Sequence, residues 1–272
     1  MMKHQTTSQQ ATQPTQVAQV TSIGAAPAIR FHNVTLGYGD RPAVHHLDGT
    51  VTAGSLTAVI GPNGSGKSTL LKGIIGQLRP LGGSIEVAGI APGEIAYLPQ
   101  QATIDRGFPI DVSELVALGL WSRLGAWRGL SAVDRDRIAA ALAAVGLKGF
   151  ERRGIDTLSG GQLQRALFAR VLVQDSSLIL LDEPFAAIDA RTCADLMEVI
   201  QRWHGERRTV VAVLHDFEMV RERFPSSLLL AREVVAWGDT SIVLTSANLN
   251  KARAMSEHWA FDAPVCHKDE AA

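Results

Sequence analysis

The stretch Gly61-Pro62-Asn63-Gly64-Ser65-Gly66-Lys67-Ser68-Thr69 decides the fold of this chain. It fits the glycine-rich pattern of a phosphate-binding loop, the P-loop. It follows the apolar run Leu56 to Ile60 and precedes Thr69 to Leu78, a stretch that favours a helix. Glycines let the backbone turn its amides toward phosphate oxygens at a helix N-terminus. The sequence therefore predicts a strand, loop and helix unit that binds nucleotide phosphates.

Three side chains at the end of this loop suit ATP with Mg²⁺. Lys67 supplies a positive charge for the β- and γ-phosphates, and the Ser68 hydroxyl is a ligand for Mg²⁺. Thr69 is placed to bond an α-phosphate oxygen.

A second cluster stands at the end of another apolar strand, Leu178 to Leu181, which is followed by Asp182 and Glu183. Asp182 can hold the Mg²⁺ shell across from the P-loop. Glu183 points differently and is placed to polarise an attacking water as general base. The pair predicts hydrolysis as well as binding.

The remaining pattern indicates one α/β domain with an insertion. Short β-type runs stand at Ala28 to Val34, Ser84 to Ala88, Ile95 to Leu98 and Thr209 to Leu214. Uninterrupted apolar runs such as the last one are typical of parallel strands buried on both faces. Between about 101 and 157 helical periodicity takes over. There Ser131 is a candidate N-cap, and Ile138, Leu142 and Val145 recur on one face.

Composition narrows the possible partners. The 272 residues include 26 Lys and Arg against 27 Asp and Glu, so charge gives no case for nucleic acid as a partner. Cys193 and Cys266 form no CxxC pair, which argues against a disulfide framework or a Cys-rich zinc site. No apolar run approaches the roughly 20 residues that cross a bilayer. If the protein acts at a membrane, we expect another chain to span it.

Leu158-Ser159-Gly160-Gly161-Gln162, together with the P-loop and Asp182-Glu183, resembles the signature of ABC-type ATPases. Ser159 can cap a helix that begins near Gly161, and the two glycines expose amides at its positive end. In the family this segment is a second phosphate-binding site, and it contacts the nucleotide held by the opposite subunit. The resemblance therefore implies a homodimer that closes around ATP.

Four further positions are similar to functional residues of the family. Tyr38 looks like the aromatic that stacks on adenine, and Gln100 like the glutamine that senses Mg²⁺ and the γ-phosphate. Asp189 matches the loop that passes between subunits, and His215 the histidine that contacts the γ-phosphate. From the residues alone, Tyr38 could lie in the core or on the surface, Asp189 could be a helix cap and His215 a solvated group.

The resemblance implies an α/β fold: a P-loop NTPase (RecA-like) core with a mainly parallel sheet, an antiparallel β-subdomain and an inserted α-helical lobe at about 101–157. The ATPase domain is expected at 28–250. A disordered tail is expected at 1–27 and a C-terminal extension at 251–272.

The function implied is the ATP-hydrolysing subunit of an ABC importer. It would lie at the cytoplasmic face of the cell membrane, bound to integral-membrane permease subunits. It would contact a substrate-binding protein only indirectly, and it would bind no nucleic acid. The alternatives are a soluble ABC ATPase acting on nucleic acid or ribosomes and a nucleotide-gated module without turnover. The short segment between Lys67 and Ser159, the single cassette, and the presence of Glu183 and His215 favour the importer.

The lobe also suggests what is transported. Residues 107–112, 119–125 and 130–135 resemble the lobe of ATPases from manganese, zinc and iron-chelate importers, so we expect a divalent metal, with a non-metal solute as the alternative. Three lobe aromatics, Phe108, Trp121 and Trp127, either face the permease or fill the lobe core. The tail residues His258, Cys266 and His267 match no zinc pattern, so we expect a solvated extension there.

Overall fold

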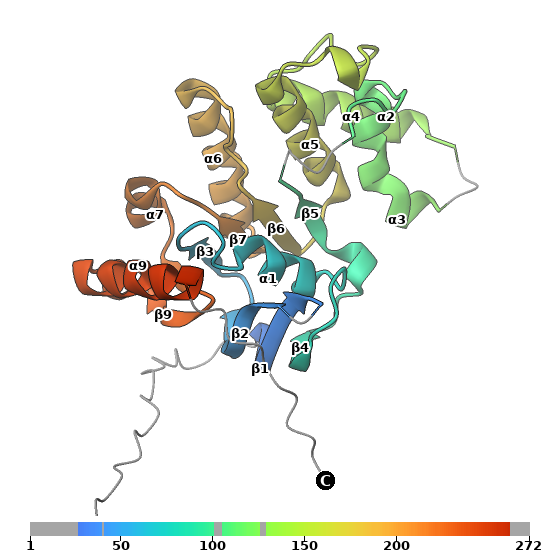
Figure 1. Cartoon of the computed structure of the whole chain (residues 1–272). Helices are drawn as coiled ribbons and strands as arrows, with labels where there is room; N and C mark the ends of the chain where they lie inside the picture. Colours follow the sequence, from blue (N-terminus) through green and yellow to red (C-terminus); the bar gives the residue numbers. More distant parts are fainter. Residues whose placement is uncertain (1–26, 40, 101–104, 126–128, 262–272) are drawn as a thin grey trace, which may run out of the picture.

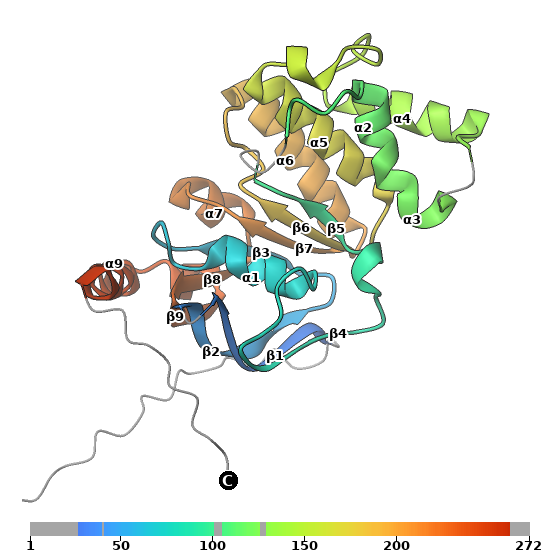
Figure 2. The same ribbon diagram turned by 45° about the vertical axis from the view of Figure 1, so that its right-hand side comes forward.

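The computed structural model describes residues 27–39, 41–100, 105–125 and 129–261. This described part of the chain contains two sheets, a helical lobe and further helices that pack on the sheets (Figures 1 and 2). The strands are β1 (Pro27–Tyr38), β2 (Arg41–Thr52), β3 (Leu56–Ile60), β4 (Gly82–Val87), β5 (Ala96–Leu98), β6 (Leu178–Asp182), β7 (Thr209–Val213), β8 (Ser226–Ala231) and β9 (Glu233–Asp239). The α-helices are α1 (Lys67–Ile74), α2 (Val112–Ala117), α3 (Trp121–Leu124), α4 (Ala132–Ala144), α5 (Gly160–Gln174), α6 (Ala190–Gly205), α7 (Phe217–Arg223), α8 (Thr240–Val243) and α9 (Ser246–Phe261).

The larger sheet confirms the predicted core. Its strand order is β5-β6-β7-β3-β8-β9, and all neighbours are parallel except β8 and β9. Side chains alternate between two hydrophobic clusters along β6: Ile179 and Leu181 enter one, Leu178 and Leu180 the other. Burial on both faces is why this strand reads as a continuous apolar run.

The smaller sheet is the expected antiparallel subdomain, with the order β2-β1-β4. Leu70, Leu71 and Ile74 of α1 share a hydrophobic cluster with residues of β1, β2 and the larger sheet. The helix that follows the P-loop therefore packs between the two sheets.

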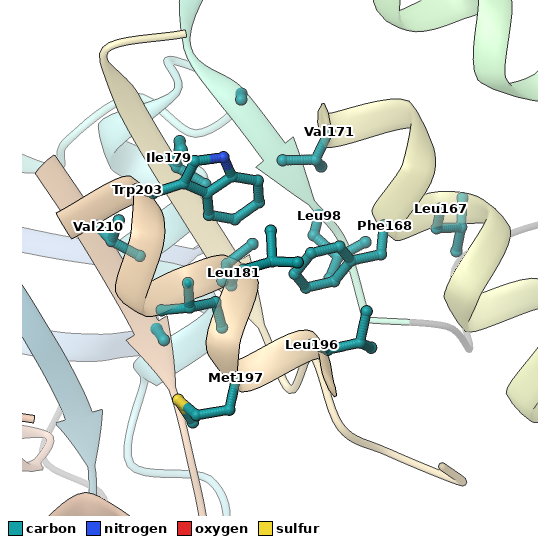
Figure 3. Close-up of a cluster of buried hydrophobic side chains, with 14 of the residues drawn as sticks. Leu98, Leu167, Phe168, Val171, Ile179, Leu181, Leu196, Met197, Trp203 and Val210 are labelled. Carbon is teal, nitrogen blue, oxygen red and sulfur yellow. The ribbon is translucent and has the colours of Figure 1, made fainter. Parts of the chain in front are cut away.

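The predicted helical lobe comprises α2, α3 and α4 on the outer side of α5, as Figure 2 shows. Ser131 caps α4 in a capping box with Asp134, as expected, and Ile138, Leu142 and Val145 are buried. Phe168 of α5 stacks on Trp203 of α6 with ring centroids 5.4 Å apart (Figure 3). Because α5 packs on the lobe and shares this core with α6, it joins the lobe to the sheet.

Several predicted boundaries differ from the structure. The helix expected over Thr69 to Leu78 runs from Lys67 to Ile74. It begins earlier because Gly66 takes a left-handed N-cap conformation, and it ends earlier because Gly76, at φ 75°, terminates it in a Schellman motif. The first strand extends to Tyr38 rather than Val34 because it pairs with β2 on one side and β4 on the other.

The C-terminal extension expected from residue 251 begins inside α9, which packs on β8 and β9 and buries Ala252. Folded structure therefore continues to Phe261. Cys266 and His267 lie outside the described residues, as does the expected tail apart from Pro27. Within the described residues, no helix is both long enough and apolar enough to cross a membrane.

Candidate active site

The P-loop adopts the cradle shape that its glycines predict. Gly66 has φ 94°, and a Cβ there would collide with the backbone of Ala43, so only glycine fits. The ammonium of Lys67 donates to the carbonyls of Gly61 at 3.0 Å and Pro62 at 2.8 Å. Burial lowers the pKa of Lys67, while Glu183 and Asp182 nearby act in the opposite direction. The ammonium of Lys67 thus lies against the first carbonyls of its own loop, where it can meet phosphate.

Ser68 and Asp182 form the part of the site that fits Mg²⁺. The Ser68 hydroxyl donates to Oδ1 of Asp182 at 2.9 Å. Burial raises the pKa of Asp182, and the bond from Ser68 partly opposes this. A magnesium ion prefers oxygen ligands and would offset the cost of burying this carboxylate. The described residues hold no group of three or more His, Cys, Asp or Glu side chains placed to bind a metal.

Glu183 lies between two other residues that the sequence predicts for the site, Gln100 and His215. Its Oε2 accepts from the Gln100 amide at 3.1 Å, and its Oε1 lies 2.8 Å from Nε2 of His215. The three residues follow β5, β6 and β7, which are neighbours in the sheet. The carboxyl ends of parallel strands meet at one edge, so residues far apart in sequence converge there. The arrangement orients a carboxylate that can accept a proton from water.

Tyr38 stands at the end of β1 with 55% of its surface exposed. Lys72 of α1 donates to its hydroxyl at 3.3 Å. This exposure excludes a core role for the tyrosine and leaves its ring open to a stacking partner.

The signature segment is built as its sequence predicts. Ser159 caps α5: its hydroxyl accepts from the amide of Gln162 at 3.2 Å, and the Gln162 side chain accepts from the amide of Ser159 at 2.9 Å. Among the described residues, the hydrogen bonds of the Ser159 and Gln162 side chains stay within this cap.

Asp189 is the N-cap of α6, where its carboxylate accepts from the amide and the hydroxyl of Thr192 at 3.0 and 2.8 Å. These bonds lower its pKa. The structure therefore gives Asp189 the capping role that its residue type allows, and its role between subunits stays a prediction.

Sequence reasoning missed one residue beside the site, Gln164. It is completely buried on α5, and its amide contacts the backbone of Glu183 and Pro184. The signal was present: Gln164 shares a helix face with Leu167, Phe168 and Val171, so a polar side chain stands on an apolar stripe. Such a residue needs a polar partner inside the fold.

A protein-family model described as "ABC transporter" matches residues 44–186. A probable metal transport system ATP-binding protein of Chlamydia pneumoniae is 38% identical over 77% of this chain and 82% of the relative. A manganese transport system ATP-binding protein of Bacillus subtilis is 35% identical over 82% and 91% of the two chains. A zinc transport system ATP-binding protein of Treponema pallidum is 36% identical over 84% and 87%.

Solved structures agree with these sequence relatives. A putative metal-chelate type ABC transporter in an inward-facing conformation matches with a TM-score of 0.73 and 28% identity, covering 84% of this chain and 90% of that one. A dimeric ATP-binding cassette in a post-hydrolysis state with ADP and Pi matches with a TM-score of 0.70 and 26% identity, covering 78% and 98%.

Proposed function

This chain is an ATPase of the ABC transporter family, and from that premise we propose that it powers the import of a divalent metal ion through a separate membrane permease. The observation that carries ATP hydrolysis, the energy source in this proposal, is the convergence of Gln100, Glu183 and His215 beside the Ser68–Asp182 pair. A nucleotide switch without turnover would not need a base oriented in this way.

Each site residue has a proposed task. The backbone of Gly61 to Gly66 and the side chains of Lys67 and Thr69 hold phosphates, and Tyr38 stacks on adenine. Ser68, Asp182 and Gln100 would hold Mg²⁺, which when bound neutralises charge on the β- and γ-phosphates. Glu183 accepts a proton from the attacking water, and His215 holds that water near the γ-phosphate.

The working unit is proposed to be a homodimer. Ser159 to Gln162 form a capped helix N-terminus that can bind phosphate. A related cassette has been solved as a dimer. We propose that the signature of each chain closes on the ATP held by its partner's P-loop, with Asp189 at the boundary between the two sites.

The surface that meets the permease is proposed to lie on the lobe. Phe108 is 60% exposed and Trp121 is 59% exposed, so neither fills the lobe core. Trp127 lies outside the described residues. Exposed aromatic side chains favour a protein partner, because burying them stabilises an interface. Attachment through this surface would hold the chain at the cytoplasmic face of the membrane and only indirectly near a substrate-binding protein.

The proposed cargo is zinc or manganese. The support is the similarity to proteins named for manganese and zinc transport in two organisms, together with the lobe resemblance. An importer of a non-metal solute is the remaining alternative. A soluble ATPase acting on nucleic acid or ribosomes has no such support here.

Deletion of the gene tests the cargo. We expect the deletion strain to grow poorly under chelation, to recover with added Zn²⁺ or Mn²⁺, and to contain less of that metal by mass spectrometry. Complementation with the wild-type gene should restore the metal content, whereas a Glu183→Gln gene should not. Unchanged metal content in the deletion strain would exclude the metal while leaving the ATPase assignment intact.

A further inference from the structure

We infer that Gln164 is a positioning residue that holds the backbone of Glu183 in its working geometry and ties it to α5, the helix that carries the signature. The inference rests on the proposed role of Glu183 as general base. Nε2 of Gln164 donates to the carbonyl of Glu183 at 3.3 Å and to that of Pro184 at 3.2 Å. Both neighbours can only accept, so the orientation of the amide is determined by chemistry.

The backbone at Glu183 needs such support. Glu183 has φ 51°, a left-handed conformation that residues with a side chain rarely adopt. Proline at the next position further restricts the residue before it toward extended conformations. A strained residue of this kind persists only when its surroundings hold it. Gln164 binds the carbonyls on both sides of the 183–184 junction, which is where the strain lies.

Burial of Gln164 is costly, which argues against a role in packing alone. The side chain is fully buried, and its Oε1 has no hydrogen-bond partner among the described residues. A leucine or methionine would fill the same space without burying an unpaired acceptor. The two donated bonds are therefore the feature that a glutamine adds at this position.

A second contact joins the same two segments. Gly161 of the signature lies so close to the loop after Glu183 that a Cβ would come within 2.7 Å of the Ala187 carbonyl. The start of α5 thus touches this loop at Ala187 and, through Gln164, at Glu183. If α5 moves with the lobe, these contacts would move the backbone of Glu183, the proposed general base.

The test replaces Gln164 with methionine, which keeps the length of the side chain and removes the donors. We expect kcat for ATP hydrolysis to fall about 10-fold to 100-fold, since a small misplacement of a catalytic group costs that much. The KM for ATP should change less than about twofold, because Gln164 does not touch the nucleotide. Gln164→Glu, whose buried carboxyl is favoured in its neutral form and keeps one donor, should give an intermediate kcat.

Gln174 provides a matched control on the same helix. Its amide donates to the carbonyl of Ile95 at 3.0 Å, away from Glu183. Gln174→Met removes the same kind of bond, and we expect its kcat to match that of the wild type. An equal loss of kcat in both variants would point to general loosening of α5 and overturn the inference.

A double-mutant cycle with Glu183→Gln separates positioning from structure. Measured in single turnovers, Gln164→Met should add no further loss in the Glu183→Gln background, because the group that it positions is already gone. If Gln164→Met lowers kcat by the same factor in both backgrounds, or leaves kcat unchanged in the wild-type background, the inference is overturned.

If Gln164→Met does not fold, the comparison is made with Gln164→Glu. Normal hydrolysis by Glu183→Gln itself would overturn the proposed role of the base, and the inference with it.

Discussion

At the scale of single residues, the proposed roles separate groups that would bind phosphate from groups that would act on water. The ammonium of Lys67 lies against the carbonyls of Gly61 and Pro62 in the P-loop, where we propose that it contacts the β- and γ-phosphates. His215 lies instead against the carboxylate of Glu183 at 2.8 Å. Substitution of Lys67 should therefore affect ATP binding, whereas substitution of His215 should affect the rate of hydrolysis.

Lys67→Ala should weaken ATP binding about 10-fold to 100-fold, the loss expected for hydrogen bonds to charged groups. His215→Ala should leave binding nearly unchanged and lower kcat about 100-fold or more, the usual contribution of a group that positions proton transfer. Fluorescence titration with a nucleotide analogue measures the first effect and steady-state kinetics the second. Equal losses of ATP affinity in both variants would refute these roles.

His45 makes a prediction about pH. It is 4% exposed, and burial lowers its pKa below the ordinary value of 6.5, with Glu233 acting in the opposite direction. The unfolded chain therefore binds more protons than the folded one just below pH 6.5, so this residue destabilises the fold progressively as pH falls through that window. Well above pH 6.5 the ring is neutral in both the folded and the unfolded chain, so this loss of stability is absent there.

Urea unfolding at pH 8 and pH 5.5 measures this effect. We expect His45→Gln, which cannot take up the proton, to lose less stability between the two pH values than the wild type does. A parallel decline in both proteins would show that His45 does not contribute.

At the scale of elements, the lobe depends on capped helices. Ser131 and Asp134 exchange hydrogen bonds with each other's backbone at the start of α4. Ser131→Ala removes the cap and should destabilise the protein by about 1 kcal/mol. The activity should stay within about twofold, because α4 carries none of the site residues and such caps act on stability.

Urea unfolding and hydrogen exchange over 132–144 test the cap. Ser122→Ala provides the control, since Ser122 is an exposed serine within α3 and caps no helix. Loss of ATPase activity without loss of stability in Ser131→Ala would contradict this account of the lobe.

At the scale of the whole molecule, activity is proposed to need two chains. Glu183→Gln should bind ATP, fail to hydrolyse it by orders of magnitude, and accumulate a closed dimer with Mg²⁺ and ATP that size-exclusion chromatography resolves. Adding Lys67→Ala to this variant should return it to the monomer, because the nucleotide that joins the chains is then lost. A Glu183→Gln protein that stays monomeric and hydrolyses ATP at the wild-type rate would refute the site.

Local chemistry made part of this molecule predictable. The P-loop, the strand that ends at Asp182, and the caps at Ser131 and Ser159 all depend on residues within a few positions of one another. The same is true of the fold class, because apolar runs on either side of a glycine loop indicate buried parallel strands. The family resemblance implies that Tyr38, Gln100 and His215 belong to one site, and the structure brings Gln100 and His215 against Glu183.

The amino-acid sequence by itself determined the nucleotide loop, the buried parallel strands and the helical insertion. Only the tertiary structure decided that Gln100 and His215 both contact Glu183, and that Gln164 contacts the backbone of Glu183 and Pro184. The physical reason is the separation along the sequence between the residues that interact. Periodicity and capping are set by neighbours along the chain, whereas contacts between strand ends and between α5 and β6 exist only after the sheet has ordered its strands and the core has packed.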